Sequence, residues 1–394
     1  MIILDRPYAS KFLEDTIIKM KLPVLNNETV KEFDLSKDIN LLQEKDFIKK
    51  FRENEELYIY CNSENSINWM TNNLAFTGLP EKIEIFKDKV KFRKLLKEVY
   101  PDFFFKEVPF EDLEEIDVGK IKKPFIIKPS VGFFSMGVYK VNNDTEWMDI
   151  LRKIKTDVDE MKGNYPLEVI NSSKFIIEEN IEGEEFAVDA YFNSDGKPVI
   201  LNIFKHIFSS DKDVSDRVYI TSKGIIEKYI EPFTRLLLEM GNLVDLKNFP
   251  MHVEYRVESN NIKNYKIIPI EVNPMRFAGW CTTDIAYYGY GINVYEYFFT
   301  QKQPDWKKIL NDKDDSIYSI IIADLPKDIV IEDIKDIDYD RFTSHFEKPL
   351  ELRKINYKKH GVFAFLFAET RKSNQTELEE ILRSDLKEYL VLKN

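Results

Sequence analysis

Along the first eighty residues, short apolar runs alternate with stretches in which apolar residues recur every three or four positions. The short runs predict three strands, at Met1–Leu4, Pro23–Leu25 and Leu57–Cys61. The recurring spacing is that of a helix face, and it predicts helices at Phe12–Met20, Leu41–Phe51 and Ser63–Leu74. Strands that alternate with helices are typical of a small layered α/β domain.

Beyond about residue 85, strands follow one another directly and single helices interrupt them. Helices are predicted at about Lys87–Val99, between Trp147 and Met161, and near Gly224–Met240. The predicted strands are Phe125–Lys128, Val138–Val141, Phe175–Glu178, Glu185–Phe192, Val199–Phe204, Met251–Val257 and Lys266–Val272. The polar stretch Ser209–Lys223 has the composition of a mobile loop.

The last ninety residues carry a shorter pattern of their own. Two apolar runs, Ile317–Ala323 and Gly361–Ala368, predict strands, and a charged helix is predicted from Thr376 to Leu390. This favours a small α+β appendage. With 394 residues, the chain is expected to form two to four domains that combine α/β and α+β parts.

Charge and composition narrow the function classes. The net charge of −12 disfavours nonspecific binding to nucleic acid or an anionic membrane, since both are polyanions. No run approaches the roughly 18 apolar residues that span a bilayer, and Met1–Pro7 lacks the layout of a signal peptide. Cys61 and Cys281 belong to no metal-ligand pattern, so we expect neither structural zinc nor a disulfide framework, and a cytoplasmic location.

A loop rich in glycine and serine joins two predicted strands after Lys128. Its sequence, Lys128–Val138 (KPSVGFFSMGV), has glycines spaced as in a Walker loop but lacks the required Lys-Ser/Thr, and it joins strand to strand. Small residues still let backbone N–H groups approach phosphate oxygens, with Lys128 supplying a positive charge. An ordinary hairpin explains this segment equally well.

Two further segments are rich in carboxylates. In Glu178–Asp189 (EENIEGEEFAVD), a strand ends and another begins with a carboxylate that could accept from ribose hydroxyls; a solvated acidic turn is the alternative. In the second segment, Glu271 and Asn273 lie two apart and therefore share one strand face. Glu254 on the neighbouring predicted strand can join them, giving oxygen ligands suited to Mg²⁺. The alternative is that this face is simply the solvent side.

Together, the order of these motifs resembles the ATP-grasp superfamily. A strand lysine, a Gly/Ser hairpin, EENIEGEE, HVE and EVNP follow one another at its spacing over about residues 85–300. The superfamily includes D-alanine–D-alanine ligase, biotin carboxylase and L-amino-acid ligases. The resemblance implies a pre-ATP-grasp domain (1–85), a small subdomain (86–178), a large subdomain with the metal site (179–303) and the C-terminal α+β part (304–394).

The resemblance also implies roles for individual residues. Those implied for nucleotide binding are Lys89, Lys128, Ser130, Gly132, Ser135, Met136, Gly137, Glu178, Glu179, Ile181, Glu185 and Lys205. Those implied for the metal are Glu254, Glu271 and Asn273. Arg276 would stabilise an oxyanion, although Met275 stands between it and the Asn-Pro pair, unlike in many members.

The implied function is that of an ATP- and Mg²⁺-dependent ligase. It would activate a small-molecule carboxylate as an acyl phosphate and pass the acyl group to an amine, releasing ADP and phosphate. Two alternatives stay open: another acceptor, as in a carboxylase or a carboxylate–thiol ligase, and a non-catalytic ATP-binding module. Family members are commonly homodimers, but this sequence leaves the oligomeric state open.

Overall fold

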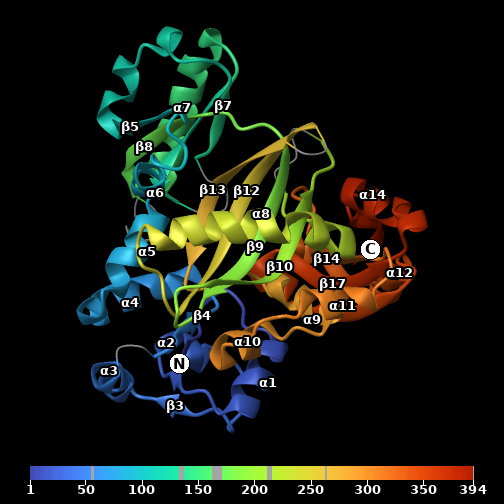
Figure 1. Cartoon of the computed structure of the whole chain (residues 1–394). Helices are drawn as coiled ribbons and strands as arrows, with labels where there is room; N and C mark the ends of the chain where they lie inside the picture. Colours follow the sequence, from blue (N-terminus) through green and yellow to red (C-terminus); the bar gives the residue numbers. More distant parts are fainter. Residues whose placement is uncertain (55–56, 133–136, 162–170, 211–214, 262–263, 394) are drawn as a thin grey trace.

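The computed structural model describes residues 1–54, 57–132, 137–161, 171–210, 215–261 and 264–393. In Figure 1, the N-terminal part lies at the bottom, a small subdomain stands at the top, and the C-terminal part lies at the right of a large central sheet. Within the described residues, no helix has both the length and the apolar character that crossing a membrane requires.

The N-terminal part is the predicted α/β layer structure. Its parallel sheet has the order β3-β2-β1-β4. The strands are β1 (Ile2–Ile3), β2 (Val24–Leu25), β3 (Leu41–Leu42) and β4 (Tyr60–Cys61), and the helices are α1 (Lys11–Met20), α2 (Glu28–Glu32), α3 (Glu44–Glu53) and α4 (Ile67–Asn73). The helix predicted from Leu41 begins later, because Leu41 and Leu42 pair with β2.

The helix predicted from about Lys87 to Val99 begins later and ends earlier, and a second helix that was not predicted precedes it. α5 (Leu79–Lys87) ends before Asp88, and α6 (Lys89–Leu95) begins after it. The Asp88 carboxylate accepts from the backbone N–H groups of Val90 and Lys91, as a helix N-cap does. This cap places Lys89 at the first turn of α6.

The small subdomain is a four-stranded sheet covered by one helix. Its order is β5-β8-β6-β7. The elements are β5 (Phe105–Pro109), β6 (Phe125–Val131), β7 (Tyr139–Val141), α7 (Trp147–Met161) and β8 (Asn171–Glu179). The predicted apolar stripe of α7 is buried in the core of this subdomain, from Trp147 to Val158.

The central sheet has eight strands in the order β13-β12-β9-β10-β11-β14-β17-β16. Its first five are β9 (Glu184–Phe192), β10 (Pro198–Ile207), β11 (Val218–Ser222), β12 (Phe249–Asn261) and β13 (Asn264–Pro274). β11 lies within the stretch predicted as a loop, because its residues pair with β10 and β14. The long helix α8 (Lys223–Asn242) lies across one face of the sheet (Figure 1).

The C-terminal strands continue this same sheet, a continuity that the sequence pattern did not predict. They are β14 (Ile317–Asp324), β16 (Pro349–Lys354) and β17 (Val362–Thr370), and β15 (Ile334–Ile337) pairs with β18 (Leu390–Leu392). The helices are α9 (Ile285–Tyr290), α10 (Val294–Thr300), α11 (Trp306–Asn311), α12 (Tyr339–Ser344), α13 (Tyr357–His360) and α14 (Thr376–Arg383). The last helix was predicted to continue to Leu390, but α14 ends at Arg383 because the backbone is extended at Ser384.

Candidate functional site

The candidate site lies on the face of the central sheet opposite α8. Phe186 of β9 and Tyr255 of β12 pack against aromatic rings of α8. Because side chains alternate along a strand, the neighbouring positions face the other way. The strand register therefore gathers polar residues on that second face: Glu185, Asp189, His206, His252, Glu254, Arg256, Glu271 and Asn273.

The three residues expected to hold a metal meet on β12 and β13. The predicted hairpin forms, with Glu254 opposite Glu271 and His252 opposite Asn273. Asn273 is buried, and its Nδ2 lies 3.5 Å from Glu254 Oε1. Burial, followed by the nearby carboxylates of Glu271 and Glu185, raises the pKa of Glu254 well above its usual range.

The chemistry of this set fits a magnesium ion. Carboxylate and amide oxygens are the ligands that Mg²⁺ takes, and two opposed carboxylates repel each other unless a cation lies between them. Among the described residues, no three His, Cys, Asp or Glu side chains form a metal-binding group. The candidate magnesium site instead combines two carboxylates, Glu254 and Glu271, with the amide of Asn273. The metal role of these residues remains a prediction.

Lys89 connects this metal set to the Gly/Ser hairpin. Its Nζ lies 3.4 Å from Glu271 Oε1 and donates to the carbonyl oxygen of Gly132 at 3.2 Å. The side chain is buried. A lysine so placed brings a positive charge between the carboxylates and the start of the loop, as the phosphate-binding prediction requires.

A second buried cluster contains a residue that the sequence reasoning missed. Lys128 Nζ lies 2.6 Å from Glu178 Oε1, and Arg93 NH2 lies 2.6 Å from Glu178 Oε2. Burial by itself would raise the pKa of Glu178, but Arg93 and Lys128 outweigh it and lower that pKa to about 2. Arg93 also donates to the carbonyl oxygen of Pro269, so it ties α6 to β13. Its four-residue spacing from Lys89, one helical turn, was the available signal.

Glu185, the predicted ribose carboxylate, is held by two basic side chains. Its Oε1 lies 3.1 Å from His206 Nδ1, and its Oε2 lies 2.7 Å from Arg256 NH2. Burial opposes ionisation of Glu185, but the hydrogen bond from His206 and the charge of Arg256 keep its pKa below its usual value. Glu185 is therefore an ionised hydrogen-bond acceptor whose orientation is fixed by His206 and Arg256.

A histidine and an aspartate lie beside the metal set. Asp189 is fully buried, and its Oδ1 lies 2.8 Å from His252 Nδ1 and accepts from the backbone N–H of Ala278 at 2.8 Å. His252 Nε2 lies 3.8 Å from Glu254 Oε1. The Asp189–His252 pair thus connects β9 to β12, and the bond from Ala278 connects Asp189 to the chain beyond β13.

Arg276 lies two residues beyond the end of β13 and contacts the N-terminal part. Its NH2 donates to Glu64 Oε1 at 2.7 Å, and its NH1 donates to the carbonyl oxygen of Phe277 at 3.0 Å. Glu64 also forms an ion pair with Lys87. Neither Glu64 nor Lys87 was predicted, and no local sequence pattern marks them.

The structure does not bring every predicted residue to this face. Lys205 is on the opposite face of β10, where its side chain pairs with Glu184. Ser130 is buried in β6, and Gly132 and Gly137 flank the hairpin. Glu179 and Ile181 lie at the connection between β8 and β9. Ser135 and Met136 are outside the described residues.

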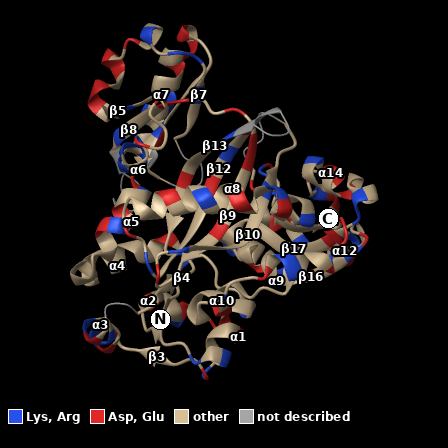
Figure 2. Cartoon of the chain, viewed as in Figure 1, with Lys and Arg blue, Asp and Glu red and all other residues tan. Residues whose placement is uncertain are grey.

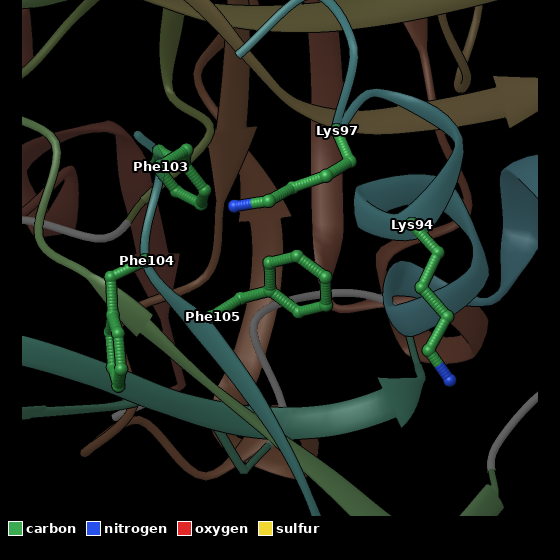
Figure 3. A pocket seen from close by; sticks show the side chains of 5 residues that line it. All are labelled: Lys94, Lys97, Phe103, Phe104 and Phe105. Carbon is green, nitrogen blue, oxygen red and sulfur yellow. The ribbon is translucent and has the colours of Figure 1, made fainter. Parts of the chain in front are cut away.

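A separate depression of about 390 Å³ lies between the end of α6 and the start of β5, lined by Lys94, Lys97, Phe103, Phe104 and Phe105 (Figure 3). Lys97 points between the rings of Phe103 and Phe105, whereas Lys94 points away and pairs with Glu107. None of the predicted site residues lines it. Figure 2 shows both signs of charge over all parts of the fold, with no single basic face in that view.

Comparison with known families agrees with this geometry. Residues 121–284, which include the Gly/Ser hairpin and all three candidate metal ligands, match the model of the ATP-grasp domain. This chain contains an ATP-grasp domain. The carbamoyl phosphate synthase large chain of Thermoanaerobacter sp. (strain X514) is 24% identical over 199 residues, 49% of this chain. The match spans only 16% of that relative's length.

Solved ATP-grasp structures resemble the whole chain. The L-amino acid ligase from Bacillus licheniformis is 16% identical, with a TM-score of 0.66 over 100% of this chain and 98% of that one. The biotin carboxylase from Campylobacter jejuni is 13% identical, with a TM-score of 0.64 over 100% of this chain and 91% of that one. The likeness in fold to these two structures therefore extends over the N-terminal and C-terminal parts. At these identities, the likeness concerns the fold alone.

Proposed function

We propose that this protein is an ATP- and Mg²⁺-dependent ligase that activates a carboxylate as an acyl phosphate and transfers the acyl group to an amine. The observation that carries the proposal is the convergence of Lys89, Glu254, Glu271 and Asn273 beside the Gly/Ser hairpin, with Arg276 at the end of the metal strand. Phosphate-binding cations and carboxylate ligands for a divalent ion belong together in a phosphoryl-transfer site.

Each group has a defined part in the proposed reaction. Glu254, Glu271 and Asn273 would hold Mg²⁺, which when bound would supply positive charge that offsets the charge of the phosphates. Lys89 and Lys128 offset negative charge at the phosphates.

In the first step, a carboxylate oxygen forms a bond to the γ-phosphorus, and the bond from that phosphorus to the bridging oxygen breaks and releases ADP. In the second step, an uncharged amine attacks the acyl carbon, and phosphate and a proton leave. The guanidinium of Arg276 stabilises the oxyanion that forms in this second step.

Hydroxylamine trapping tests the proposal. An acyl phosphate is electrophilic, so hydroxylamine should convert it to a hydroxamate in a reaction that needs ATP, Mg²⁺ and the substrate acid together. Screening of carboxylic acids by ADP release identifies the acid, and its natural amine should lower hydroxamate as amide rises. Steady ADP release that never yields hydroxamate across that screen would refute the acyl-phosphate step.

The second candidate is an ATP-grasp enzyme with another acceptor, and the likeness to a biotin carboxylase supports keeping it. Competition separates the alternatives. A carboxylate–thiol ligase should also give hydroxamate, but a thiol would compete with hydroxylamine. A carboxylase of the biotin type should consume ATP with bicarbonate and no organic acid. A non-catalytic module should bind nucleotide without releasing ADP.

A further inference from the structure

Arg276 is held by hydrogen bonds and stays partly exposed. Two of its N–H groups are used, one by the Glu64 carboxylate and one by the carbonyl oxygen of Phe277. A guanidinium has five N–H groups, so donors remain for a substrate oxygen. The side chain keeps 15% of its surface exposed, which leaves it accessible while its head is fixed.

The carboxylate that anchors it comes from the N-terminal part, 212 residues earlier in the chain. Glu64 lies three residues after β4, and β4 is itself bonded to the loop that carries Arg276. The backbone N–H of Cys61 donates to the carbonyl oxygen of Met275 at 2.9 Å. Met275 has a φ of 65°, a conformation uncommon for a residue with a side chain. Backbone and side-chain contacts therefore fix the same loop from the same domain.

Lys87 adds a second cation to this arrangement. It pairs with the second oxygen of Glu64, and both side chains are buried. Burial opposes ionisation of Glu64, but Lys87 and Arg276 lower its pKa to about 2. With one carboxylate and two cations, the cluster keeps one net positive charge. Glu64 can thus orient Arg276 without removing the field that an oxyanion needs.

We infer that Glu64 is a positioning residue, which holds the Arg276 guanidinium at the reacting carbonyl through their direct ion pair, while Lys87 binds the second oxygen of Glu64 and keeps the cluster one charge positive. The inference rests on the proposed function and extends the site to the N-terminal domain. A directional bond matters here because a displacement of about 1 Å in a catalytic group can cost on the order of 100-fold in rate.

Substitution of Glu64 should lower turnover more than substrate affinity. For Glu64→Gln, we expect kcat for hydroxamate formation to fall roughly 100-fold, with the KM for ATP close to that of the unaltered protein. Glu14→Gln is the matched control, because Glu14 is a buried carboxylate of the same domain that bonds to Ser36 N instead. The control should retain its kcat.

A purely structural role is separated by removing the buried charges as a pair. Glu64→Gln alone leaves Lys87 buried without its carboxylate, so its Tm should fall. The double variant Glu64→Gln/Lys87→Met no longer buries an unpaired lysine and should regain part of the lost Tm, although Arg276 still lacks its carboxylate. If Glu64 orients Arg276, the double variant stays slow although it is stable. Recovery of kcat together with Tm would overturn the inference.

A second cycle tests whether Glu64 acts through Arg276. In an Arg276→Ala background, Glu64→Gln should cause no further loss of kcat, because the group that it orients is absent. Independent, multiplicative losses would contradict the inference. If the unaltered protein releases ADP but forms no hydroxamate, the proposed function fails. The same cycle, measured on ADP release, then still decides the role of Glu64.

Discussion

The charge cluster at Glu178 permits a stability prediction. Glu178 is 2% exposed and lies between Arg93 and Lys128. Its pKa falls from the ordinary 4.5 to about 2 in the folded protein. At about 1.4 kcal/mol per pKa unit, the ionised carboxylate contributes roughly 3 kcal/mol near neutral pH. Removing one partner of a buried ion pair costs about 3–5 kcal/mol, which is the same range.

We therefore expect Glu178→Gln to lower the free energy of unfolding by about 3 kcal/mol at pH 7. Because the folded pKa lies below the unfolded pKa, this contribution is present above about pH 4.5 and is lost as the pH falls towards 2. The difference between the variant and the unaltered protein should shrink over that interval.

Urea titrations at several pH values, followed by tryptophan fluorescence, measure this difference. Glu179→Gln is the neighbouring control: Glu179 is only partly buried, its Oε1 lies 3.4 Å from Phe104 N, and its substitution should change the free energy by about 0.5 kcal/mol or less. A difference for Glu178→Gln that stays constant from pH 7 to pH 3 would refute the electrostatic explanation, even if its size at pH 7 were correct.

Three further outcomes are expected. Glu271→Gln should abolish ADP release with little change in the thermal melt, and ADP release at the original rate would remove Glu271 from the metal site. Lys128→Ala should weaken binding of a nonhydrolysable ATP analogue far more than Lys140→Ala, whose side chain is exposed on β7; equal affinities in calorimetry would exclude Lys128 from the nucleotide site. Cys61 and Cys281 should resist iodoacetamide at pH 8 until urea is added, because burial raises the pKa of both thiols; labelling of the native protein at the rate of a free thiol would contradict this.

The sequence pattern predicted those strands and helices whose apolar spacing is visible within the element itself. The hairpin of β12 and β13 is an example, since each strand carries its own apolar alternation and the register follows from their pairing. The helix α5 was not predicted, and the helix predicted from about Lys87 begins only after Asp88, whose side chain caps α6. β11 was missed because its residues are polar and irregular in sequence, and only pairing with β10 and β14 makes them a strand.

The same distinction applies to the candidate site. Glu271 and Asn273 could be proposed from sequence because two positions along one strand must share a face. Glu64 could not, because Arg276 lies 212 residues away; for Arg93, whose partner Glu178 lies 85 residues away, the only local signal is its four-residue spacing from Lys89. Both residues are buried and form ion pairs with other charged groups, and their positions depend on how the domains pack. A motif therefore locates the groups proposed to meet ATP and the metal, whereas the groups that hold them in place come from packing between domains. For this reason we expect the N-terminal part to determine how well Arg276 functions, although the family motifs lie outside it.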